Sequence, residues 1–264
     1  MRVLQVGFGT IGREIFTDYS AAFAFDTYMV VDLVAPIPEG YGWDGGTVDV
    51  AVIVVDTPSA AGGDGFDYRA LTHAIEEYSN LARFILIRST VSLGFLTEPA
   101  YLKHAGRIGF APEFYGATKW SSRDALTIDF TVFTHNVPNW FRDQASPDVS
   151  QVVAGTPSEV IVAKLTENAY LATKVTFFHE LSETCRRFGI DFENVRNIAT
   201  SDPRINSDHS FMEQLGWQSH CFDKDVPAFS ALGQRGSVVE RAIESNKLLL
   251  KRRTITETES NRLD

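Results

Sequence analysis

A thiol lies in a short segment dense in charged residues, Cys221-Phe222-Asp223-Lys224-Asp225. Acidic residues, followed by Pro227, are typical of the first turn of a helix. Backbone N–H groups at a helix start stabilise a thiolate, and the adjacent Lys224 adds positive charge. The segment therefore predicts a nucleophilic cysteine at the start of a helix, the alternative being a small buried hydrophobic residue, as most free cysteines are.

A glycine-rich segment near the start of the chain has the spacing of a dinucleotide-binding turn. Gly7, Gly9 and Gly12 follow a short apolar run and precede a helical pattern. Glycines let the backbone approach a pyrophosphate, and the helix N-terminus stabilises its charge. Asp32 follows about 20 residues beyond Gly12, where a carboxylate accepts from the ribose hydroxyls and repels a 2′-phosphate. The pattern predicts a Rossmann domain that binds NAD, the alternative being a turn that only packs a helix on a strand.

Polar residues also follow three further apolar runs, namely Thr57, Thr90 and Glu113. In a doubly wound sheet, the loops after the strand C-termini line the ligand crevice. We therefore expect these three side chains to face one cleft. Taken singly, each threonine could be a strand-end or cap residue, and Glu113 could be a solvated loop acid.

The elements that must position these residues alternate between strands and helices in the first half of the chain. This alternation predicts an α/β fold with a doubly wound parallel sheet over residues 1–150. The strands expected in it cover residues 3–6, 28–32, 49–55, 84–87, 107–110 and an edge strand over 128–134, and a helix covers 68–78.

The pattern then breaks over residues 136–155, which we expect to be irregular, and changes to helices. Thr156 and Glu159 form a capping-box pattern, and no helix breaker follows until Gly189. This predicts a long central helix of about 30 residues that packs on more than one side. Asp191 is expected to cap a shorter helix. We predict an all-helical domain over residues 151–255, with a second long helix over 236–253, and a polar tail over 256–264.

The composition fits a packed protein and excludes several classes. The chain has 264 residues, 44% of them hydrophobic, and a net charge of −10, which argues against general nucleic-acid binding. Its only cysteines are Cys185 and Cys221, so no disulfide framework is implied. No leader precedes the first strand and no apolar run reaches 18 residues, so we expect a cytoplasmic protein without a membrane span.

Taken together, the motifs resemble the UDP-glucose/GDP-mannose dehydrogenase family over nearly the whole chain. The matching pieces occur in family order: VGFGTIG, VVDTPS, RSTVSLG, APEF, AKLTENAYLATKVTFFHEL, DPRI and CFDKD. The combination of STV, PEF, the K-x-x-x-N helix and CFxKD is far more specific than the glycine motif. The resemblance implies that NAD oxidises the C6 hydroxyl of a UDP-sugar twice, as in the conversion of UDP-glucose to UDP-glucuronate.

The resemblance also implies roles for the matching residues. Cys221 would be the nucleophile that forms a thiohemiacetal and then a thioester. Lys164 and Asn168 stand four residues apart on one helical face and would stabilise charge on the substrate oxygen. The implied catalytic residues are Cys221, Lys164, Asn168, Asp225, Glu113 and Thr90, with the acids moving protons and Thr90 helping to hold a water.

The remaining implied contacts concern the cofactor, the substrate and a second subunit. The implied cofactor ligands are Gly7, Gly9, Thr10, Ile11, Gly12, Asp32, Thr57, Pro58, Thr90 and Lys224. The implied substrate ligands are Phe114, Lys164, Asn168, Arg204 and Gly216. Arg204 matches an arginine that reaches the substrate of the neighbouring subunit in family dimers, so a homodimer is expected. Lys174, on the long helix, is better interpreted as structural, and no metal is implied.

The chain departs from the family pattern at three places. The family usually has glycines directly before the nucleophile, but here Trp217-Gln218-Ser219-His220 separates Gly216 from Cys221. Tyr115-Gly116-Ala117 stands where the family has an acid after PEF. The family also has a C-terminal nucleotide-binding domain, and this sequence ends after the helix that leads into it. We expect that a second subunit or a separate protein replaces those contacts, or that the affinity for the substrate is low.

Two other classes stay open. A hydroxy-acid dehydrogenase of the 6-phosphogluconate or 3-hydroxyisobutyrate type has a similar plan but transfers one hydride and needs no cysteine. A non-catalytic NAD-binding relative would bind NAD without reducing it.

Overall fold

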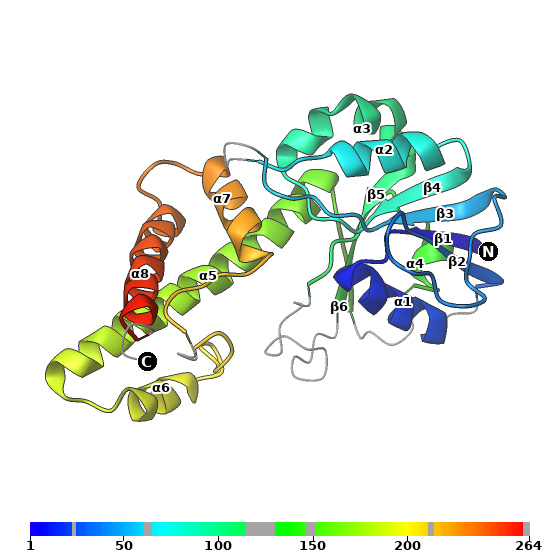
Figure 1. Ribbon diagram of the computed structural model, residues 1–264. Helices are drawn as coiled ribbons and strands as arrows, with labels where there is room; N and C mark the ends of the chain where they lie inside the picture. The colour runs from blue at the N-terminus through cyan, green and yellow to red at the C-terminus, as the bar shows by residue number, and fades with distance from the viewer. Residues whose placement is uncertain (23–24, 61–64, 115–129, 146–150, 211–213, 261–264) are drawn as a thin grey trace. The chain divides into compact units, whose positions relative to one another are not determined.

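The computed structural model of the chain describes residues 1–22, 25–60, 65–114, 130–145, 151–210 and 214–260 (Figure 1). The chain divides into two compact units, Met1–Lys164 and Leu165–Asp264. Within the described ranges, no helix is both long enough and apolar enough to cross a membrane. The first unit holds the glycine-rich segment and the second holds Cys221, so each contains part of the expected chemistry.

The first unit is built on a five-stranded parallel sheet in the order β2-β1-β3-β4-β5. Its strands are β1 (Arg2–Val6), β2 (Thr27–Val31), β3 (Val48–Ile53), β4 (Ala82–Ile87) and β5 (Ile108–Phe110). Figure 1 shows α2 (Arg69–Tyr78) and α3 (Pro99–His104) on one face of the sheet and α1 (Thr10–Ala22) on the other. Two 3₁₀ turns, η1 (Leu93–Thr97) and η2 (Ala105–Arg107), flank α3. The predicted doubly wound sheet is confirmed, with its switch point between β1 and β3.

A second, two-stranded parallel sheet follows β5. It pairs β6 (Phe130–Thr134) with β7 (Gln151–Gly155), and α4 (Asn139–Arg142) lies between them in sequence. The expectation of irregular structure over residues 136–155 was wrong at α4 and β7, and residues 146–150 lie outside the described residues. The run from Gln151 to Gly155 shows no alternation of buried and exposed residues, and its pairing with β6 makes it a strand. The first two residues of the strand predicted over 128–134 lie outside the described residues.

The second unit is helical, as expected. It contains most of α5 (Pro157–Phe188), then α6 (Phe192–Thr200), α7 (Phe222–Leu232) and α8 (Val238–Ser260). The capping box forms, because Thr156 N–H donates to Glu159 Oε2 at 2.7 Å and Glu159 N–H donates to Thr156 Oγ1 at 3.3 Å. Asp191 caps α6 by accepting from two backbone N–H groups.

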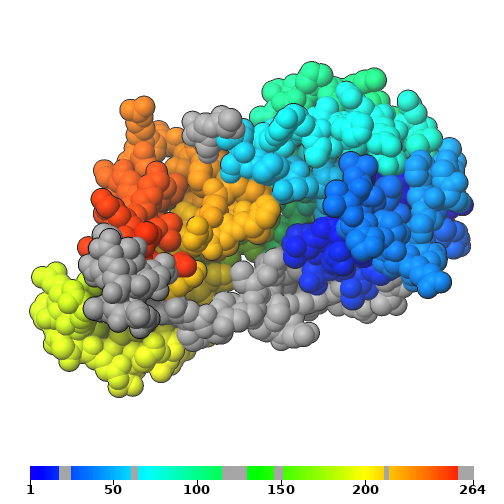
Figure 2. Space-filling model, in the orientation of Figure 1, coloured from blue at the N-terminus to red at the C-terminus, as the bar shows by residue number. Residues whose placement is uncertain are grey.

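The C-terminal helix extends past its predicted end at residue 253. α8 runs to Ser260, since the sequence after Arg253 has no glycine or proline to end it. α7 packs against α8, and their orange and red atoms lie together in Figure 2. A small core of Ala172, Trp217 and Val226 joins α5 to the segment before α7 and to α7 itself. The start of α7 is therefore anchored on α5.

Candidate active site

The glycine-rich segment forms a tight turn between β1 and α1. Gly7 has a φ of +106°, and a Cβ there would lie 2.5 Å from the carbonyl oxygen of Val54. A Cβ on Gly12 would lie 2.5 Å from the Gly7 carbonyl oxygen, whereas nothing lies within 4 Å of a Cβ built on Gly9. The turn thus needs glycine at its two ends and leaves its middle open. This cradle fits the pyrophosphate of a dinucleotide.

Asp32 is held at the same turn, just after β2. Its Oδ2 accepts from Phe8 N–H at 2.6 Å, and its Oδ1 accepts from the N–H groups of Val34 and Ala35 at 2.8 and 2.7 Å. Although burial raises the pKa of Asp32, these backbone hydrogen bonds outweigh it and hold the pKa below its ordinary value. A charged carboxylate therefore stands beside the glycine turn, as a ribose ligand requires.

The loops after β3 and β4 are tied together by hydroxyl groups. Thr57 Oγ1 donates to Thr90 O at 2.7 Å, and Ser89 Oγ donates to Val55 O at 2.6 Å. The buried Thr57 hydroxyl therefore positions the backbone of Thr90. Pro58, the next predicted cofactor ligand, is exposed in the loop after β3.

Thr90 and Lys164 line one small cavity of about 10 Å³ together with Ser89 and Pro112. That volume is about one water-sized probe. Lys164 lies in the second turn of α5, is largely buried, and sits 5.1 Å above the ring of Phe114. Three of the predicted residues, Thr90, Phe114 and Lys164, are thus brought together within the first unit.

Glu113 has a partner that the sequence reasoning missed. Its carboxylate forms an ion pair with Arg88, and both side chains are more than nine-tenths buried. Arg88 is the first residue of the segment Arg88-Ser89-Thr90-Val91, so the sequence shows that it follows the strand β4. Its pairing with Glu113 could not be predicted, because it depends on the register between β4 and β5.

In the second unit, three predicted residues form a buried polar group. Asn168 Nδ2 donates to Asp225 Oδ2 at 2.6 Å, and Lys224 Nζ donates to Asp225 Oδ1 at 2.8 Å. The Asp225 side chain is 1% exposed. Burial of a carboxylate is costly unless it is paired, and here each oxygen has a partner. Lys224 and Asp225 lie in the first turn of α7, directly after Cys221, and the hydrogen bond from Asn168 fixes that turn to α5.

Cys221 is the residue before α7 and is half-buried, whereas Cys185 on α5 is buried. The N–H groups that follow it are already bonded. Phe222 N–H donates to Ser219 Oγ and Asp223 N–H to Ser219 O, both at 3.0 Å. The N–H groups of residues 224 and 225 both donate to Cys221 O.

These N–H groups donate to oxygens of residues 219 and 221, whereas the sequence predicted that they stabilise the thiolate. The turn begins at Ser219, two residues before the thiol, so Cys221 is already within it. For the same reason Pro227 is the sixth residue of α7, beyond its first turn.

Ser219, one of the residues that replace the family's glycines, should cap this turn. We expect Ser219→Ala to lower the free energy of unfolding by about 1 kcal/mol, and Ser219→Gly to lower it by only a few tenths, because glycine tolerates the cap conformation. Urea unfolding measures both values. Ser219→Thr, which keeps a hydroxyl, is the control, and equal losses in the alanine and threonine variants would contradict a capping role.

A buried hydrogen-bond network fixes the segment before Cys221. Trp217 N–H donates to Asn246 Oδ1 at 2.7 Å, and Asn246 Nδ2 donates back to Trp217 O at 2.9 Å. The Trp217 indole Nε1 donates to Thr176 Oγ1 at 3.1 Å. Sequence reasoning missed Asn246 and Thr176, since nothing in α8 or α5 marked which polar residue would face this segment.

Gly216, a predicted substrate ligand, uses its own N–H within the protein. That N–H donates to His179 Nε2 at 3.0 Å, and Gly216 has a φ of +75° with no room for a Cβ beside Asn246. Burial lowers the pKa of His179 below its ordinary 6.5, so the ring is neutral near pH 7 and can accept. The unfolded chain takes up the proton first, so this contribution to stability is present above pH 6.5 and is lost as pH falls.

Two further cations of this unit that the sequence analysis named differ in setting. Lys174 Nζ donates to Ile205 O and to Asn206 Oδ1, both at 2.7 Å, which agrees with its structural interpretation. Arg204 has a side chain that is 88% exposed and pairs with Asp202 through two nitrogens. Its guanidinium lies at the surface of the unit.

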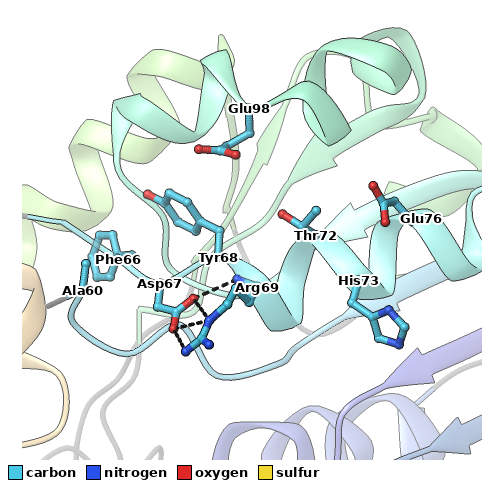
Figure 3. A pocket seen from close by; sticks show the side chains of 9 residues that line it. All are labelled: Ala60, Phe66, Asp67, Tyr68, Arg69, Thr72, His73, Glu76 and Glu98. Atoms are coloured by element: carbon cyan, nitrogen blue, oxygen red, sulfur yellow. Dashed lines mark hydrogen bonds and ion pairs between the residues drawn. The ribbon is translucent and has the colours of Figure 1, made fainter.

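A separate hollow of about 710 Å³ lies beside α2 in the first unit (Figure 3). Its acidic and basic side chains are Asp67 and Arg69, which pair with one another, and His73, Glu76 and Glu98. None of the predicted site residues lines it, so we do not assign it to the candidate site. Among the residues described, no group of three or more His, Cys, Asp or Glu side chains is placed to hold a metal ion.

Comparison with known proteins supports the expected family. Residues 158–248 match the model of the UDP-glucose/GDP-mannose dehydrogenase family, central domain. A UDP-glucose 6-dehydrogenase of Streptococcus pneumoniae is 26% identical over 216 residues, which are 76% of this chain and 54% of that protein. The chain thus spans about half the length of the curated relatives it matches. The predicted resemblance is confirmed.

Solved structures share the fold. The UDP-glucose dehydrogenase of the hyperthermophilic archaeon Pyrobaculum islandicum has a TM-score of 0.75 at 20% identity, covering 94% of this chain and 68% of that one. The 3-hydroxyisobutyrate dehydrogenase of Mycobacterium tuberculosis has a TM-score of 0.64 at 15% identity, covering 92% of this chain and 91% of that one.

Proposed function

We propose that this chain, whose residues 158–248 match the UDP-glucose/GDP-mannose dehydrogenase family, oxidises the C6 hydroxyl of a UDP-sugar to a carboxylate. UDP-glucose is the proposed substrate, because curated relatives such as the Streptococcus pneumoniae protein are named for it. The observation that carries the proposal is the buried group of Asn168, Lys224 and Asp225 directly beside Cys221, within the matched region.

NAD is the proposed cofactor. The glycine turn leaves room at Gly9 for a pyrophosphate, and the charged Asp32 carboxylate beside it suits a ribose with free hydroxyls. Leu33 and Val34, the residues after Asp32, are more than nine-tenths exposed, so an apolar surface is available to an adenine ring. A 2′-phosphate would meet the negative charge of Asp32, which favours NAD over NADP.

The proposed reaction has two oxidations and one hydrolysis. Loss of a hydride from C6 and of a proton from its hydroxyl group gives the aldehyde, the proton passing to a base or to solvent. The Cys221 thiolate adds to the aldehyde carbon, and loss of a second hydride from the thiohemiacetal gives a thioester. Water hydrolyses the thioester to the carboxylate and regenerates the thiol. When bound, NAD accepts the hydride in both oxidations.

The buried polar residues suit the charges that develop in this sequence. Lys164 and Asn168 are donors for the substrate oxygen, and loss of one such donor typically costs roughly 3 kcal/mol in the barrier. One N–H of the Asn168 amide donates to Asp225, which fixes the direction of the other. The small cavity between Thr90 and Lys164 supports a site for the hydrolytic water.

We also propose a homodimer, since α5 carries large apolar side chains that its own unit leaves exposed. Tyr170, Phe177 and Phe188 are each more than half exposed. A helix with apolar residues on more than one face needs a second partner surface. Arg204 at the surface of the same unit would then reach the neighbouring subunit's substrate.

Counting the NADH formed tests the proposal. The purified chain is incubated with NAD and, separately, UDP-glucose, UDP-N-acetyl sugars, GDP-mannose and a 3-hydroxy acid. We expect two NADH per UDP-glucose and an acid product. One NADH per molecule of a 3-hydroxy acid, with no turnover of nucleotide sugars, would identify a single-hydride dehydrogenase instead. Binding of NAD without reduction in any mixture would identify a non-catalytic relative.

A further inference from the structure

A buried amide lies directly beneath the glycine turn. Gln5, in the middle of β1, is fully buried, although the rest of the buried strand is apolar. A buried polar side chain destabilises a fold unless all of its hydrogen bonds are made, so its partners indicate what it does.

The partners determine the orientation of the Gln5 amide. Its Nε2 donates to Gly7 O at 2.8 Å and to Gly12 O at 2.7 Å, and its Oε1 accepts from the Tyr28 hydroxyl of β2. Two carbonyl oxygens can be satisfied only by the NH₂ end, and a hydroxyl proton only by the oxygen. Both N–H groups and the oxygen are therefore used.

This amide joins the two ends of the turn. Gly7 is its first glycine and Gly12, in the first turn of α1, is its third. The two hydrogen bonds fix the distance between the end of β1 and the start of α1. Asp32, bonded to Phe8 N–H, holds the same turn from β2. The turn is thus held by Gln5 below and Asp32 at the side, while Gly9 stays open.

We propose that Gln5, anchored by Tyr28, is a positioning residue that holds the glycine turn in its dinucleotide-binding conformation. The inference rests on the proposed function for the identity of the cofactor. A turn fixed before binding loses less conformational freedom when the pyrophosphate is bound, so the affinity for NAD should depend on this amide.

The test compares Gln5→Met with the wild-type chain. Methionine has a similar length and cannot make the three hydrogen bonds. We expect NAD, measured by titration calorimetry, to bind about tenfold more weakly. The KM for NAD should rise with it, while the KM for the nucleotide sugar stays unchanged. Tyr28→Phe removes only the anchor and should give a smaller loss.

Loss of stability alone must be separated from loss of positioning. Ile85→Ala removes a fully buried side chain of β4, away from the turn, and serves as the destabilised control. Without any cofactor, backbone hydrogen exchange of residues 8–12 should be faster in Gln5→Met and unchanged in Ile85→Ala at the same temperature.

NAD binding by Gln5→Met as tight as that of the control, or equal exchange of residues 8–12 in both variants, would overturn the inference. A wild-type chain that binds no NAD would instead refute the proposed function. A chain that binds NAD but oxidises no sugar would refute the proposed substrate and leave the role of Gln5 intact.

Discussion

Cys221→Ala should abolish formation of the acid product. Without the thiol the aldehyde has no nucleophile to form the thiohemiacetal, so neither the thioester nor its hydrolysis can follow. We expect acid formation to fall by on the order of 10³-fold or more, the scale seen when a covalent nucleophile is removed. Chromatography of the sugar products, with parallel counting of NADH, measures the loss.

The other cysteine of the chain provides the matched control. Cys185 is buried on α5 and takes part in no proposed step, so Cys185→Ala should keep its turnover. A thiol-labelling reagent should modify the half-buried Cys221 of the folded protein and leave Cys185 unlabelled. Full acid formation by Cys221→Ala would refute the thioester route. Unchanged turnover in that variant with one NADH per substrate molecule would favour a single-hydride dehydrogenase.

Local sequence patterns predicted most of the helices and strands, because hydrophobic periodicity and capping residues within each segment determine where they form. The apolar runs of β1, β3 and β4 match a sheet buried on both faces, and Thr156 and Glu159 marked the start of α5. β7 has no such pattern, and only its pairing with β6 makes it a strand. The length of α8 was underestimated because polarity was taken as a sign of fraying.

In the candidate site, too, some features follow from local sequence and others depend on tertiary packing. Residue types and motif order indicated which side chains carry chemistry, but not which partners they have. Asp225 could be named from sequence, whereas its contact with Asn168 joins residues 57 positions apart. Gln5 drew no attention because a polar residue in a short apolar strand carries no motif. Such partners depend on tertiary packing, which one sequence without the fold does not reveal.

The buried ion pair of Arg88 and Glu113 should be among the strongest determinants of stability in the first unit. Arg88→Met leaves the Glu113 carboxylate buried without its cation, and we expect the free energy of unfolding to fall by about 3–5 kcal/mol. Urea unfolding gives the value. The same substitution at Arg241, whose pair with Glu244 is more than half exposed, should cost less than about 1 kcal/mol.

A double variant separates the structural role of Glu113 from a chemical one. Arg88→Met combined with Glu113→Leu removes both charges, so much of the lost stability should return. If Glu113 also moves protons for the hydrolytic water, the double variant should unfold near the wild-type midpoint and still form acid slowly. Recovery of stability together with acid formation at the wild-type rate would show that Glu113 only balances Arg88, and Asp225 would then be the remaining candidate among the two predicted acids.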